Sequence, residues 1–235
     1  MHLDLRRAVV CAWAWAVLFT GIPSASVLMA TAAVVEGPTE ADLEAEFRRA
    51  RELLRASPAF IGTDAQTRYR LAEELSRRGD MNGAAEEYRA AIGLDPKFGE
   101  AYRGLGQVLL DYHDYAGAAE ALEAAVRLHR DDGESYYWLG RALMGIGRWP
   151  DAARAMEAAV RLRPDDAEAY TDLGLLHMVQ GNAIEAKAAL DRAIRSKPDD
   201  AGAHRLRELL LRHQEDRQQL MSAARRVLKD LFERE

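Results

Sequence analysis

Cysteine is almost absent from this chain of 235 residues, and its single copy, Cys11, lies in an apolar stretch near the N-terminus. One cysteine cannot form a disulfide within the chain or supply the thiolates of a structural zinc site. The sequence also lacks a glycine-rich phosphate loop, a nucleophile elbow and an HExxH pair, and its six histidines are not grouped at metal-ligand spacing. We therefore expect no catalytic residues, no metal, no cofactor and no enzymatic activity.

Basic clusters are lacking as well. The formal net charge is -6, and the lysines and arginines form no stripe that would neutralise the phosphates of a nucleic acid. We therefore expect no nucleic-acid partner. Abundant residues are alanine, leucine, glutamate and arginine, which are strong helix formers. This composition predicts an all-α protein.

The first 35 residues have the layout of an export segment. Arg6 and Arg7 precede an uninterrupted apolar run over residues 8–19, which is followed by small and helix-breaking residues around Pro23. This order is typical of a secretory signal peptide, and small residues suited to cleavage end at Ser26 and Ala32. Alternatively, residues 8–35 contain no charge and are long enough to remain as a membrane anchor.

Both interpretations of the export segment place the rest of the chain across a membrane, because basic flanking residues stay on the inner side. We therefore expect an exported protein, either soluble or anchored by residues 8–35. A bacterial periplasm is the expected location, although no residue specifies it.

Prolines reveal an internal repeat. Pro96, Pro164 and Pro198 are separated by 68 and 34 residues, and Arg130 occupies the missing position of a 34-residue period. Counting from this frame gives four units, at 65–98, 99–132, 133–166 and 167–200. A fixed period of this length is the signature of stacked helical repeats.

Other positions of the four units agree with this frame. The shared residues are leucine at the seventh position (Leu71, Leu105, Leu139, Leu173), a small residue at the eighth (Ala72, Gly106, Gly140, Gly174), and alanine at the twentieth (Ala84, Ala118, Ala152, Ala186) and twenty-seventh (Ala91, Ala125, Ala159, Ala193). Small residues allow two helices to approach closely. Glycine at the fifteenth position of three units suits a left-handed residue after a helix, and His113 in the second unit is expected to cost some stability. Asp132, Asp166 and Asp200 are expected to cap the following helices.

Residues 65–200 resemble the tetratricopeptide repeat family in repeat length and in the positions of their small residues and prolines. The resemblance implies an α-solenoid, a right-handed superhelix of antiparallel helix pairs. The units depart from the family at the fourth position, where tryptophan is common, and at the eleventh, where tyrosine is common. The residues found there are Arg68, Tyr102, Tyr136 and Tyr170 at the fourth position, and Leu75, Leu109, Leu143 and His177 at the eleventh.

The resemblance also implies a binding groove on the concave face, lined by the first helix of each unit. Its fifth and ninth positions give the candidate partner-binding residues, namely Tyr69, Glu73, Arg103, Gln107, Tyr137, Arg141 and Thr171, followed by Leu175. Arginine and tyrosine commonly anchor protein partners. We expect Arg103 and Arg141 to clamp a carboxylate or phosphate of a peptide; the alternative is a solvated face with no dominant ligand.

The ends of the chain predict further helices. Residues 36–64 are expected to hold an N-terminal capping helix that begins near Thr39 and ends near Ala56, or half of a decayed repeat. Residues 201–235 are expected to form a C-terminal capping helix and an amphipathic extension. Over 206–231 the apolar residues follow a heptad spacing, which suits either packing back on the array or self-association.

Together these features predict a non-catalytic scaffold or adaptor of the cell envelope that binds a peptide or protein segment in the groove. The alternative is a structural assembly protein that self-associates through the C-terminal amphipathic helix.

Overall fold

The computed structural model describes residues 40–55, 64–213 and 215–232. These residues form eleven helices and no strand, which confirms the predicted all-α class. The predicted export segment, residues 1–35, lies outside the described residues. Among the helices that are described, none has the length and apolar character needed to cross a bilayer.

The helix predicted at the N-terminal end is α3 (Glu40–Arg55). Its Leu53 side chain is 68% exposed. Most of α3 belongs to a different compact unit from residues 54–235. Its role as a cap of the repeats stays a prediction.

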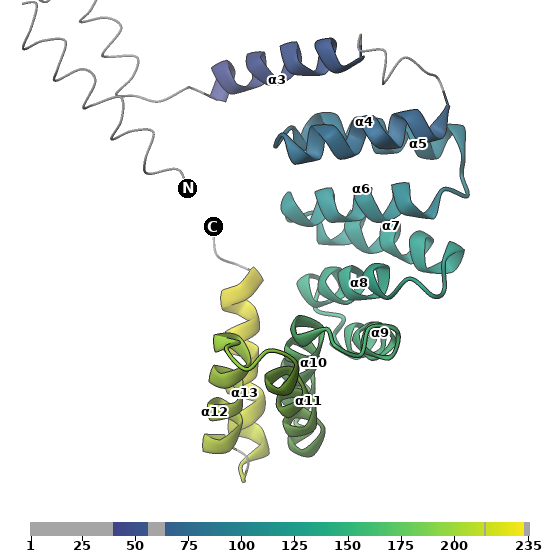
Figure 1. The fold of residues 1–235 in the computed structure, drawn as a ribbon. Helices are drawn as coiled ribbons and strands as arrows, with labels where there is room; N and C mark the ends of the chain where they lie inside the picture. Colours follow the sequence, from purple (N-terminus) through teal and green to yellow (C-terminus); the bar gives the residue numbers. More distant parts are fainter. Residues whose placement is uncertain (1–39, 56–63, 214, 233–235) are drawn as a thin grey trace, which may run out of the picture. The chain divides into compact units, whose positions relative to one another are not determined.

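Residues 65–196 form four antiparallel helix pairs stacked in chain order (Figure 1). The pairs are α4 (Ala65–Arg77) with α5 (Met81–Leu94), α6 (Gly99–Asp111) with α7 (Tyr115–Leu128), α8 (Gly133–Gly145) with α9 (Trp149–Leu162), and α10 (Ala167–Gln180) with α11 (Ala183–Ser196). The first helices therefore begin at residues 65, 99, 133 and 167, where the 34-residue units begin.

Local chemistry fixes where these helices start and stop. Asp132 and Asp166 accept hydrogen bonds from backbone amides in the first turns of α8 and α10, as the sequence predicts. Asp200 does the same for the amides of residues 202 and 203. These carboxylates satisfy amides that have no partner within the helix.

The turn between the two helices of each pair uses a left-handed residue. Gly79, Gly147 and Gly181 have φ angles of 85°, 79° and 74°, and His113 has a φ of 58°. The prediction for the fifteenth position is therefore confirmed in all four units, including the one that lacks glycine.

In three of the four pairs, a glycine at the eighth position lets the second helix approach the first, and the first pair has Ala72 there. A Cβ added to Gly106 would lie 2.5 Å from Leu122, and one added to Gly140 would lie 2.8 Å from Met156. The alanines at the twentieth and twenty-seventh positions are almost completely buried, between 0% and 1% exposed. The small residues recognised in the sequence therefore form the contact layer of the array.

The C-terminal residues form α12 (Ala201–His213) and α13 (Arg217–Phe232). Asp216 caps α13 by accepting hydrogen bonds from the amides of Gln218 and Gln219. The predicted heptad pattern is thus divided between two helices. Packing of α13 back on the array, one of the two predicted alternatives, is observed: Leu220, Ala224 and Leu228 are buried in the main core.

Two glycine-to-alanine substitutions separate backbone strain from packing. Neither Gly147 nor Gly93 has a neighbouring atom within 4 Å of an added Cβ, but Gly147 has a positive φ and Gly93 lies in α5. We expect Gly147→Ala to lower the free energy of unfolding by about 1 kcal/mol and Gly93→Ala to raise it by about 0.5 kcal/mol. Urea denaturation followed by circular dichroism measures both, and equal effects would contradict the assigned turn.

Candidate functional site

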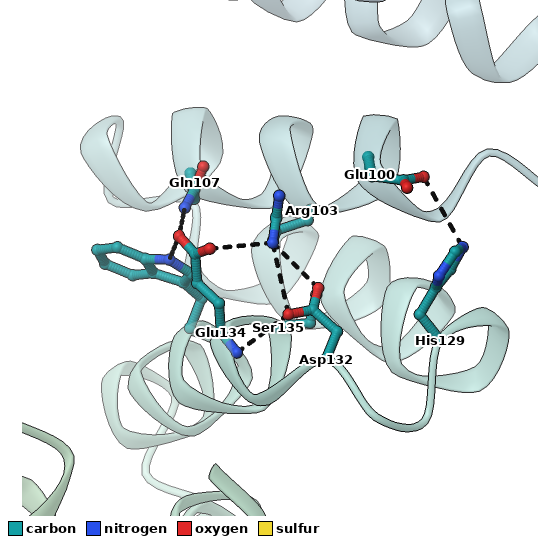
Figure 2. Close-up of polar contacts among 8 residues, drawn as sticks. Glu100, Arg103, Gln107, His129, Asp132, Glu134 and Ser135 are labelled. Carbon is teal, nitrogen blue, oxygen red and sulfur yellow. Dashed lines mark hydrogen bonds and ion pairs between the residues drawn. The ribbon is translucent and has the colours of Figure 1, made fainter. Parts of the chain in front are cut away.

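Fifth-position side chains on the first helices reach the start of the next pair. Arg103 Nη1 lies 3.1 Å from Asp132 Oδ2 and 3.0 Å from Glu134 Oε2 (Figure 2). Tyr137 donates a hydrogen bond to Glu168 Oε2 at 3.4 Å, and Thr171 donates one to Asp200 Oδ2 at 3.3 Å. Three of the candidate partner-binding residues therefore link neighbouring units.

The contacts of Arg103 belong to a larger polar network (Figure 2). Both Gln107 Nε2 and the Trp138 indole N–H donate to Glu134 Oε1, each at 3.3 Å. Ser135 donates to Asp132 at 2.6 Å. Burial opposes ionisation of Asp132, but the hydrogen bond from Ser135 and the charge of Arg103 prevail and lower its pKa. The guanidinium of Arg103 thus already has carboxylate partners.

An aromatic group occupies the groove at the first pair. The Tyr69 ring centre lies 5.0 Å from that of Phe98 and 5.9 Å from that of Tyr88. Tyr88 donates a hydrogen bond to the Glu73 carboxylate. Burial, followed by this hydrogen bond, raises the pKa of the Tyr88 hydroxyl far above its ordinary value. This end of the array therefore presents an aromatic group beside a half-buried carboxylate acceptor.

A second charged group lies between α8 and α10. Arg141 Nη1 lies 3.5 Å from the Tyr137 hydroxyl, and its charge acts on Asp172. Burial raises the pKa of Asp172 to about 6, because the attraction of Arg141 only partly offsets the loss of water and the repulsion from Glu168. Burial, together with the charge of Asp172, also raises the pKa of Tyr137 to about 12.

A cleft of about 460 Å³ opens beside these groups, between the third and fourth pairs. Tyr137 and Trp138 form an aromatic wall, with their ring centres 4.9 Å apart. Its lining residues are Glu134, Tyr137, Trp138, Arg163, Asp165, Asp166, Ala167, Glu168, Ser196 and Lys197. Its two basic residues are Arg163 and Lys197, and Arg163 is paired with Asp166 at 3.1 Å. The cleft therefore combines an aromatic wall with an excess of carboxylates.

The seven predicted residues fall into two groups. Tyr69, Glu73, Arg103 and Gln107 lie on α4 and α6, the first helices of the first two pairs. In contrast, Tyr137, Arg141 and Thr171 line a cavity that is also lined by Leu231 and Phe232 of α13. No sequence argument predicted that α13 would lie over this half of the groove.

Three residues of the cleft are not among the predicted partner-binding residues. Trp138 lies at the sixth position of its unit, which is not a candidate position. Glu134 and Glu168 occupy the second position of their units, as Glu100 does in the preceding unit, a regularity that is visible in the sequence. Within the described residues, no cluster of three or more histidine, cysteine, aspartate or glutamate side chains is arranged to hold a metal ion.

The stacked helix pairs agree with the protein family that the sequence matches. A family profile described as "Tetratricopeptide repeat" matches residues 69–133, 139–201 and 171–231, and a second profile with the same description matches residues 109–158. The chain belongs to the tetratricopeptide repeat family. The third match includes α12 and α13, so the repeat signal extends beyond the four predicted units. No curated protein matches the chain.

Solved structures confirm the tetratricopeptide-repeat solenoid. YrrB, described as a repeat protein of this family with an unusual peptide-binding site, is 24% identical, with a TM-score of 0.61 over 78% of this chain and 91% of YrrB. MamA is 25% identical, with a TM-score of 0.61 over 71% of this chain and 90% of MamA. PilF of Pseudomonas aeruginosa is 19% identical, with a TM-score of 0.62 over 82% of this chain and 87% of PilF.

The raised pKa of Asp172 predicts a pH-dependent stability. An unfolded aspartate ionises near 3.8, so the folded repeat protein holds the proton more tightly between that pH and about 6. Stability contributed by this group is therefore lost as the pH rises through that window. We expect Asp172→Asn to raise the free energy of unfolding at pH 7 by about 1–2 kcal/mol and to have little effect near pH 3.5.

Urea denaturation of the wild type and the variant at a series of pH values measures this difference. Asp131→Asn, at an exposed turn position, is the matched control and should show no pH-dependent difference. A variant less stable than the wild type at pH 7 would mean that the attraction between Asp172 and Arg141 exceeds the cost of burial.

Proposed function

We propose that this protein is a non-catalytic interaction scaffold of the cell envelope, whose concave groove binds a peptide or protein segment. Its helix pairs present side chains from successive first helices along one face, and such extended surfaces suit the recognition of chain segments. The cleft beside Trp138 is the observation that supports this proposal most directly, because it joins an aromatic wall to charged groups in one accessible recess.

The charges of the cleft favour a basic segment over the acidic one expected from the sequence. Arg103 is already paired with Asp132 and Glu134, so it has little charge left for a further carboxylate. Glu134, which also pairs with Arg103, lines the cleft together with Asp165 and Glu168, beside the Tyr137 and Trp138 rings. A lysine or arginine would gain carboxylate contacts and a cation–π contact in this recess. We therefore propose that the bound segment contains lysine or arginine.

An array of short overlapping peptides from exported proteins of the source organism tests this proposal. We expect the peptides that bind to be enriched in lysine and arginine, with binding that weakens as salt is added. The double variant Glu134→Gln/Glu168→Gln should lower the affinity for a selected peptide about tenfold, equivalent to about 1.4 kcal/mol.

The matched control is Glu120→Gln/Glu185→Gln, which removes the same charge from exposed positions on the second helices α7 and α11. It should bind like the wild type. If the protein instead prefers acidic peptides, and Arg141→Ala removes that preference, the basic-segment proposal is overturned. That result would favour the clamp for a peptide carboxylate that the sequence predicts. The absence of any peptide preference would count against groove recognition altogether.

The proposed location is testable in the source organism. We propose that residues 8–35 export the chain to the periplasm, either as a cleaved signal or as an anchor. N-terminal sequencing and membrane fractionation distinguish the two: a start after Ser26 or Ala32 with soluble protein indicates cleavage, whereas an intact start in the membrane fraction indicates an anchor. An intact chain in the cytoplasmic fraction would contradict both.

A further inference from the structure

Helix α13 departs from the packing rule of the other second helices. Each of α5, α7, α9 and α11 packs chiefly on the first helix of its own pair, whereas α13 packs more extensively on α10 than on its own neighbour α12. Its Leu220, Ala224 and Leu228 side chains are 1%, 0% and 5% exposed. The last helix therefore occupies the groove side of the array instead of completing a fifth pair.

Contacts with the turns of three successive units hold α13 in this place. Arg217 Nη2 donates a hydrogen bond to the carbonyl of Gln180 at 3.1 Å, next to the turn of the fourth unit. The Arg225 guanidinium lies 5.2 Å from the ring centre of Trp149, which begins the second helix of the third unit. Phe232 packs edge-on against Tyr115 of the second unit, with ring centres 5.4 Å apart.

The spacing of these contacts matches the spacing of the stacked units. Residues 217, 225 and 232 are eight and seven positions apart, which corresponds to roughly 11–12 Å along a helix. The axes of packed helices lie about 8–10 Å apart. Two turns of α13 therefore cover about the distance from one first helix to the next. The three contacts of α13 are therefore spaced to reach three successive units of the array.

The docking of α13 leaves space beneath it. Cavities of about 250 Å³ and 590 Å³ lie along α13, and residues of α8, α10 and α12 contribute to their walls. Asp172 lines both cavities, so a charged group faces the docked helix. Leu231 of α13 remains 53% exposed. We call the surface of α8, α10 and α12 on which α13 lies its seat. The cavities show that α13 occupies this seat without filling it completely.

The rest of the array does not depend on α13 for its connections. Helix α12 packs on α11, as each first helix packs on the preceding second helix. Between α12 and α13, the backbone amide of Asp216 donates a hydrogen bond to the carbonyl of His213 at 3.1 Å. Release of α13 therefore requires rotation between these two helices and exposure of its apolar seat, but no separation of the earlier helix pairs.

We propose that the groove over α8, α10 and α12 is a binding site for an amphipathic helix, which α13 fills in the isolated chain and which a partner helix takes by displacing α13. The partner chemistry follows from α13: aliphatic or alanine side chains about one turn apart on one face, as in Leu220, Ala224 and Leu228, with an arginine placed to lie over Trp149. Helix-in-groove recognition uses this kind of spacing. The proposal rests on the groove function proposed above and adds the class of ligand for its C-terminal half.

A labelled peptide with the sequence of residues 215–235 is the probe, and full-length protein is the receptor. The variant Leu228→Glu places a carboxylate in the apolar seat and should release α13 in its own chain. We expect the peptide to bind this variant at least about tenfold more tightly than the wild type, because the wild-type seat is open only in a minor fraction of molecules. Fluorescence anisotropy measures both affinities.

Ser222→Glu is the matched control, since it adds the same charge to an exposed position of α13. This variant should bind the peptide no better than the wild type. A peptide that itself carries Leu228→Glu should bind neither protein. In case Leu228→Glu prevents folding, Arg225→Ala/Phe232→Ala weakens the contacts to Trp149 and Tyr115 without placing a charge in the core, and should increase peptide binding in the same direction.

Hydrogen exchange supplies the second measurement. In the releasing variant, the amides of α13 should exchange faster while those of α4 to α11 keep their protection. Loss of protection in α10 as well, or release of α13 without peptide binding, would overturn the proposal. A wild-type dimer that Leu228→Glu abolishes would support it and identify α13 of a second copy as the partner helix. Binding of basic peptides through Glu134 and Glu168 is measured separately, so its failure is distinguishable.

Discussion

The close approach of two helices at glycine and alanine positions is the constraint on which the rest of the structure depends. Leu122 lies where Gly106 has no side chain, and Met156 takes the same place against Gly140. Because a larger residue at these points would separate the helices, every unit repeats the same spacing, and the contact layer between helices is built from alanines that are almost fully buried. This regular spacing aligns the first helices so that their side chains form one continuous face.

The same constraint gives the groove its charge. Each helix of the stack begins with amides that need acceptors, and Asp132 and Asp166 supply them for α8 and α10. Glu134 and Glu168 follow in the first turns, where the helix dipole favours negative charge. Since the aligned first helices all begin at one edge, these stabilising carboxylates collect along it. The acidity of the cleft is therefore partly a consequence of helix capping, and Arg103 offsets only part of it.

The sequence predicted the helix pairs well because their determinants are local and recur every 34 residues. It also predicted the left-handed turn at His113, since neighbouring units have glycine there. It did not predict that Arg103 would pair with carboxylates 29 and 31 residues away, or that Trp138 would line the cleft, because such contacts depend on how units stack. The heptads of residues 206–231 were visible, but a seven-residue period suits a coiled coil and a helix across stacked helices equally well.

The cleft and the cavity beneath α13 share three residues, and this couples them physically. Tyr137, Glu168 and Lys197 line the acidic cleft and also the cavity beneath Leu231 and Phe232. Burial and the negative charge of Glu168 both oppose ionisation of Asp172. A bound basic segment that draws the Glu168 carboxylate into the cleft would move this charge away from Asp172. Coupling between two binding equilibria is reciprocal. If binding of a basic segment changes the equilibrium between docked and released α13 by some factor, then release of α13 changes the affinity of the cleft for that segment by the same factor. A competing helix can bind only those molecules in which α13 is released. Its apparent affinity is therefore its intrinsic affinity multiplied by the fraction of molecules in that state. In this proposal, the C-terminal helix packs on the end of the array and limits which partners reach the adjoining half of the groove.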